Sequence, residues 1–127
     1  MAFDDLIETA LAYFLGTDKV YDFLVYTSSA KTAHRDVTGY TTSFMVKRRR
    51  TDADLAAILT KAGVVSGTFN ASPALNTQKI SVTLVDDETD TEIAPGVAYW
   101  ELKRTNSGSE DVLAFGTIEL RRAVHVS

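Results

Sequence analysis

The chain has 127 residues, of which 45% are hydrophobic and 24% are charged, with a formal net charge of -4 and a pI of about 5.1. This composition is that of a single globular domain and excludes a disordered chain. The absence of cysteine excludes disulfides and zinc–thiolate sites. The acidic balance makes a polyanion an unfavourable partner for the molecule as a whole.

The first 16 residues have two interpretations. Apolar residues at spacings of three and four favour a short helix over residues 3–14, with one face made of Phe3, Leu6, Ile7, Ala10, Leu11 and Phe14. The alternation of Leu11, Tyr13 and Leu15 favours an extended segment ending at Gly16 instead. Acids stand where an export signal carries cations, and no apolar run reaches the ~20 residues that cross a bilayer. We therefore expect no export signal and no membrane partner.

After Gly16 the hydrophobic pattern alternates with a period of two, which is typical of half-buried strands. The alternating segments are residues 20–27, 40–48, 79–85, 96–104 and 112–124. Three sets of residues are each expected to share one face of a strand: Tyr21, Phe23 and Val25; Tyr40, Thr42, Phe44 and Val46; and Ile80, Val82 and Leu84. In residues 96–104, Ala98, Trp100 and Leu102 are expected to face inward. Gly116 lies inside the last segment, where a bulge or a close backbone approach is the usual reason for glycine.

Turn residues separate these segments, at Asp36 to Gly39, at Ala94-Pro95-Gly96 and at Thr105 to Gly108. Short strands at such regular intervals predict an all-β sandwich or barrel. Residues 51–63 remain ambiguous. They suit a helical turn capped by Asp52 or Asp54, or a strand that pairs with residues 64–69.

Two charged runs are candidate sites. Lys47, Arg48, Arg49 and Arg50 end a strand, but alternation divides them between two faces, which favours a solvated strand end or a salt-bridging protein surface over a nucleic-acid site. The acidic run DDETDTE, residues 86–92, lacks the glycine and glutamate register of a calcium loop. We expect no metal, no cofactor and no nucleic-acid partner.

Candidate catalytic residues are few. His34 precedes a turn and His125 lies near the end of the chain, and neither adjoins a nucleophile elbow, a metal-spaced partner or a phosphate loop. The sequence therefore predicts a protein without catalytic residues, and not an enzyme. Trp100 alternates with the apolar set and is expected to pack in the core, whereas Tyr26, Tyr40 and Tyr99 are expected to be partly exposed.

Three motifs occur in a defined order along the chain. Asp36, Thr38 and Gly39 precede one alternating strand, Pro95, Gly96 and Tyr99 begin another, and Gly116 with Ile118 belong to the last. This order resembles the immunoglobulin-like domain near the N-termini of bacteriophage baseplate upper proteins and tail-fibre proteins, over residues 11–126. The chain differs in having Val37 where the family has leucine, and in lacking the long shaft or receptor-binding part that usually follows.

The resemblance implies an immunoglobulin-like β-sandwich over residues 17–127, preceded by an N-terminal packing segment over residues 1–16. It implies a virion protein that acts as an adaptor or accessory subunit of the tail, baseplate or fibre. Its partners would be other virion proteins, and it would form a homo-oligomer in a symmetric ring or array. We expect the partner interface to include Phe3, Leu6, Ile7, Phe14, Arg48, Arg49 and Arg50. The alternatives are a capsid decoration protein and a carbohydrate-binding adhesion module.

Overall fold

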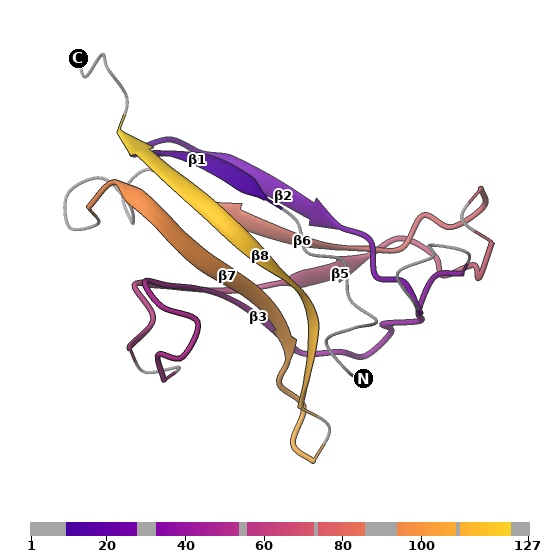
Figure 1. Ribbon diagram of the computed structural model, residues 1–127. Coiled ribbons are helices and arrows are strands. Elements are labelled where there is room, and N and C mark those ends of the chain that lie inside the picture. The colour runs from indigo at the N-terminus through magenta and orange to yellow at the C-terminus, as the bar shows by residue number, and fades with distance from the viewer. Residues whose placement is uncertain are drawn as a thin grey trace.

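A computed structural model describes residues 10–27, 33–53, 56–72, 74–85, 94–108 and 110–122 (Figure 1). These residues form strands and no α-helix. The strands are β1 (Leu11–Leu15), β2 (Lys19–Phe23), β3 (Thr42–Lys47), β4 (Leu59–Ala62), β5 (Val64–Ser66), β6 (Lys79–Leu84), β7 (Gly96–Arg104) and β8 (Asp111–Arg122). The all-β expectation is therefore confirmed.

The strands form two sheets that pack face to face. The larger sheet has the order β1-β8-β7-β3-β4, and the smaller sheet has the order β2-β6-β5. Neighbouring strands are antiparallel except β1 and β8, which are parallel. In an immunoglobulin-type sandwich, strands B, E and D lie in one sheet and strands G, F and C lie in the other. Here β2-β6-β5 take the places of B, E and D, and β8-β7-β3 take those of G, F and C. The observed sandwich thus matches the expected fold class.

Alternate residues of both sheets face inward and form one core. The fully buried members include Phe44, Val46, Ile80, Val82, Leu84, Ala98, Leu102 and Ile118. Trp100 is only 2% exposed, and its ring lies 5.1 Å from that of Phe23 and 5.8 Å from that of Phe44. The inward face of Ala98, Trp100 and Leu102 and the core position of Trp100 are therefore confirmed. Burying side chains of this size stabilises the fold by roughly 1.5–3 kcal/mol each.

The chain crosses from the larger to the smaller sheet at Gly63. Strand β4 pairs with β3, and β5 continues directly from β4 but pairs with β6. The strand interpretation of residues 51–63 is therefore correct for Leu59–Ala62, but its expected pairing with residues 64–69 is wrong. One residue between β4 and β5 is too short for the hairpin turn that their pairing would need, and glycine suits the crossing because a Cβ on Gly63 would lie 2.3 Å from Thr42 Oγ1. The expected helical turn falls partly outside the described residues, and next to it the Ala56 amide donates to the Ala53 carbonyl at 2.8 Å. Asp54 and Leu55 lie outside the described residues.

The N-terminal segment is extended where the structure describes it. Residues Leu11–Leu15 form β1, which pairs with Ile118 to Arg122 of β8. Tyr13 and Leu15 are buried in the core of the sandwich, so these residues belong to it rather than to a separate helix. The expected packing residues Phe3, Leu6 and Ile7 lie outside the described residues.

The long last strand contains a bulge, but not at its glycine. The register between β7 and β8 shifts between Leu102 and Lys103, whose partners are Ala114 and Val112, so Leu113 is the additional residue. Gly116 is in regular register opposite Trp100. The bulge alternative for Gly116 is therefore wrong, and this glycine lies instead beneath a surface hollow.

Candidate protein–protein interface

The outer face of the larger sheet carries cations, aromatic rings and exposed apolar side chains together. The strand register places Lys47 beside Tyr99 and Thr117 in one row across β3, β7 and β8. The next row places Met45 beside Glu101 and Phe115. Because residues directly opposite each other point to the same side of a sheet, these six side chains share the outer face.

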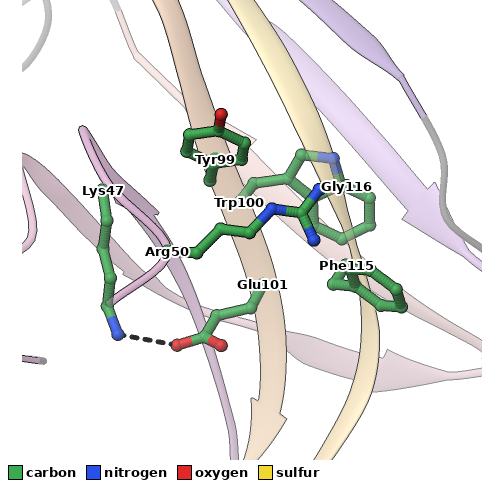
Figure 2. A pocket seen from close by; sticks show the side chains of 7 residues that line it. All are labelled: Lys47, Arg50, Tyr99, Trp100, Glu101, Phe115 and Gly116. Atoms are coloured by element: carbon green, nitrogen blue, oxygen red, sulfur yellow. Dashed lines mark hydrogen bonds and ion pairs between the residues drawn. The ribbon is translucent and has the colours of Figure 1, made fainter. Parts of the chain in front are cut away.

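A shallow hollow lies between these rows. It encloses about 80 Å³ and is lined by Lys47, Arg50, Tyr99, Trp100, Glu101, Phe115 and Gly116. Figure 2 shows Arg50 reaching over β7 toward Gly116 on β8, with the rings of Tyr99 and Phe115 on either side. Gly116 stands opposite Trp100 in the row between these two, and that row faces the core.

The Arg50 guanidinium contacts two aromatic rings at once. Its Cζ lies 4.8 Å from the ring centroid of Tyr99 and 5.6 Å from that of Phe115. Each such cation–π contact contributes about 0.5–1 kcal/mol at an exposed site. The two rings thus hold a long, otherwise flexible side chain against the sheet.

Lys47 and Glu101 form an ion pair at the edge of the hollow. Lys47 Nζ donates to Glu101 Oε1 at 2.9 Å, and the Lys47 side chain is buried although it carries a charge (Figure 2). Leaving a buried charge without its partner is far more costly than removing the pair altogether. Glu101 therefore holds Lys47 in place at the edge of the hollow.

The other two arginines of the run point elsewhere. Strand β3 ends at Lys47, so the alternation expected through Arg50 stops there. Arg48 donates through Nη2 to the carbonyl oxygen of Ala94, just before β7. Arg49 is exposed, and its backbone exchanges hydrogen bonds with Asp52 at 3.1 and 3.2 Å. The cationic run is thus a turn whose three arginines have different surroundings.

A second group of exposed residues lies on the same face, near the end of β8. Phe14 is 46% exposed and Val97 is 62% exposed. Arg121 lies over the Phe14 ring, with its Cζ 5.8 Å from the centroid, and its Nε donates to Glu119 at 3.0 Å. This ion pair lowers the pKa of the Glu119 carboxyl, through the hydrogen bond from Arg121 and then through its charge. Of the expected interface residues, Phe14 and Arg50 therefore share one face.

The described residues contain neither a metal-binding cluster nor a membrane-spanning helix. They contain no group of three or more His, Cys, Asp or Glu residues that would hold a metal ion. His34 is buried, with 4% of its surface exposed. Its ring stacks on that of Tyr26, and the two ring centroids lie 4.4 Å apart. No helix among the described residues is long and apolar enough to span a membrane. His125 and residues 86–92 fall outside the described part.

No family model matches the chain, and no curated protein matches it.

Sequence reasoning did not find the hollow itself. Tyr99 was expected to face outward and Gly116 was noted as a mid-strand glycine, but Phe115 was not singled out, and the meeting of these residues depends on the register of β7 against β8. That register is changed by the bulge at Leu113.

Proposed function

We propose that the protein is a structural subunit of a tailed-bacteriophage virion, an adaptor or accessory subunit of the tail, baseplate or fibre that acts through protein–protein contacts and performs no reaction. The order of three motifs supports the assignment to a virion: Asp36-Thr38-Gly39, Pro95-Gly96-Tyr99 and Gly116-Ile118. The hollow beside Arg50, on the outer face of the larger sheet, is the observation that supports contact with other proteins.

The size of this hollow favours a protein partner over a small substrate. Ligand pockets usually enclose about 300–1,000 Å³, whereas this one encloses about 80 Å³. A space of that size receives one side chain. Interfaces are enriched in aromatic residues and arginine, and their strongest contacts are single side chains inserted into such pockets.

The neighbouring apolar residues extend the same surface. Phe14 and Val97 are both about half exposed or more, and the Phe14–Arg121 row lies next to the row that contains Val97 and Glu119. Covering them with a partner would remove apolar area from water at about 25 cal/mol per Å². The rings and the Arg50 guanidinium then supply specificity beside this apolar contribution.

The test is to locate the chain in particles of the phage that encodes it. Antibodies against the chain, used for gold labelling of purified particles, are expected to mark the tail, and mass spectrometry is expected to find the chain in the same particles. Labelling of the head would favour the capsid decoration protein instead. Absence from washed particles, together with retention on a glycan array, would overturn the proposal in favour of an adhesion module.

A matched pair of variants tests the surface itself. Phe115→Ala enlarges the hollow and removes one ring from Arg50, so particles should incorporate this variant less than the wild-type chain. Val20→Ala removes an exposed side chain from the smaller sheet and should be incorporated normally. Equal incorporation of the two variants would show that the outer face of the larger sheet is not the contact.

A further inference from the structure

The outer face of the larger sheet carries both a hollow and an exposed aromatic ring. The hollow lies around Gly116 of β8, and the rings of Tyr99 and Phe115 line it together with the Arg50 guanidinium (Figure 2). The exposed ring is that of Phe14 on β1, which is 46% exposed. One face therefore holds a space for a side chain and an aromatic side chain open to solvent.

The lining of the hollow suits an aromatic ring. The Arg50 Cζ lies 4.8 Å from the ring centroid of Tyr99 and 5.6 Å from that of Phe115, and a further ring entering beside it would extend this cation–π contact. Aromatic rings also attract one another in offset and edge-to-face arrangements. The strongest contacts of an interface tend to face each other across it, and aromatic residues are common among them. Phe14 has the chemistry that the hollow accepts.

Phe14 does not reach the hollow of its own copy. It stands opposite Arg121 in the β1–β8 register, whereas Gly116 lies five residues earlier on β8. This separation is about 17 Å at ~3.3 Å per residue, which is much longer than a phenylalanine side chain. Because the sheet fixes both positions, a Phe14 ring that fills the hollow has to come from a second copy of the chain.

The positions of the ring and the hollow fit a two-fold axis between two copies. In a two-fold contact residue i of one copy meets residue j of the other, and j meets i. The midpoint between Arg121 and Gly116 on β8 falls next to Glu119. Glu119 stands opposite Val97 of β7, which is 62% exposed, so the centre of the contact contains an apolar residue. Each Glu119 stays neutralised, because Arg121 of the same copy donates to both of its oxygens at 3.0 Å.

We propose that two copies of the chain pair through the outer faces of their larger sheets, and that the Phe14 ring of each copy enters the hollow of the other. The contact is closed, with Val97 of both copies at its centre. The inference rests on the proposed function, because it names the partner for the same face. Its tests use the isolated chain, so a chain that is present in particles but monomeric in solution would overturn the inference alone.

The first test is sedimentation velocity of the wild-type chain and of two variants that each lose an exposed apolar side chain. Phe14→Ala removes the ring that enters the hollow. Leu24→Ala removes a side chain of similar exposure, 48% against 46%, that directly follows β2 of the smaller sheet. Phe14→Ala should weaken association at least about tenfold, and Leu24→Ala should leave it unchanged. A wild-type chain that stays monomeric to about 1 mM, or equal association of the two variants, would overturn the inference.

Mixing two variants tests whether the contact is reciprocal. Phe14→Ala removes the ring and Phe115→Ala removes one wall of the hollow, so each variant alone loses both of the ring-in-hollow contacts in a pair. A mixed pair keeps one of them, between the Phe14 ring of the Phe115→Ala chain and the intact hollow of the other chain. The mixture should therefore associate more strongly than either variant alone. Association of the mixture no stronger than that of the single variants, with both folded by circular dichroism, would overturn the inference.

A disulfide at the axis gives a readout that does not depend on changes to the hollow. The chain has no cysteine, so Val97→Cys introduces a single thiol at the centre of the contact. Val64→Cys introduces one at nearly the same exposure, 63% against 62%, on β5 of the smaller sheet. A disulfide needs Cα atoms within about 7 Å of each other, which a two-fold axis beside Val97 provides. Val97→Cys should form a covalent dimer under mild oxidation and Val64→Cys should not. Equal rates of dimer formation by the two variants would overturn the inference.

Discussion

Replacing Gly63 with alanine tests whether the crossing between the two sheets requires a residue without a side chain. A Cβ at this position would lie 2.3 Å from Thr42 Oγ1 and 2.7 Å from Ile80 Cγ2, where ordinary contacts are 3.4–4 Å. Both neighbours are buried, so relief requires them or the backbone to move within the core. Overpacking of this kind costs about 1–3 kcal/mol. Gly63→Ala should therefore lower the free energy of unfolding by that amount.

The assay is urea denaturation followed by the fluorescence of Trp100, the single tryptophan, which is buried in the native state. The midpoint temperature of thermal unfolding should fall by roughly 3–5 °C for each kcal/mol of unfolding free energy lost in a domain of this size. Gly39→Ala is the control. A Cβ on Gly39 meets no atom within 4 Å, and only its φ of 79° is unfavourable for alanine, which costs on the order of 1 kcal/mol.

A double-mutant cycle isolates the contact. Among the described residues, Thr42 Oγ1 is buried and has no hydrogen-bond partner, so Thr42→Ala removes the nearest obstacle without breaking a hydrogen bond. The double variant should then be less destabilised than the sum of the two single variants, with a coupling of about 0.5–3 kcal/mol. Additive effects, or a Gly63→Ala variant as stable as the wild type, would refute the steric explanation.

Three further predictions concern single side chains. Gln78→Ala should cost about 1–3 kcal/mol of unfolding free energy, because it leaves the buried Val37 amide without the Gln78 oxygen that it contacts at 3.0 Å; an unchanged urea midpoint would contradict this. Burial raises the pKa of the Tyr21 hydroxyl from 10.0 to about 12. The stability that the neutral hydroxyl contributes is therefore fully present below pH 10 and is lost as the pH rises to 12. Wild-type stability should fall over this range on the order of 2 kcal/mol more than that of Tyr21→Phe; parallel profiles would contradict the raised pKa. Arg50→Gln should lower the free energy of unfolding by less than about 1–2 kcal/mol, yet it should reduce incorporation into particles. Arg49→Gln should leave both quantities unchanged. Equal incorporation of the two variants would count against the hollow as a contact.

The candidate interface was only partly predictable from the sequence. Phe14 and Arg50 were expected at an interface, and they do lie on one exposed face. The sequence did not indicate that Tyr99 and Phe115 flank Arg50, because the two rings are 16 positions apart in the chain and meet only through the β7–β8 register. The meeting of Arg35 with Arg104 at Tyr40 is equally non-local. The spacing of hydrophobic residues along a sequence does not indicate which loops lie together at one end of a sandwich.

The sequence by itself determined the strands and their inward faces. Alternation along residues 79–85 and 96–104 is a local property, because a strand buries every second side chain whichever strand lies beside it. Turn residues acted locally too: Gly39 and Gly108 have positive φ in the turns where they were expected. Sequence patterning therefore was sufficient for the fold class.

Only the tertiary structure decided how the strands pair. The choice between helix and strand at Leu11–Leu15 depended on β8 being available beside it, and β4 likewise pairs with β3, which lies more than ten residues before it in the chain. These outcomes reflect contacts between residues distant in sequence, whose energies no local period contains. Contacts of the same long-range kind place Arg50 against the rings of Tyr99 and Phe115.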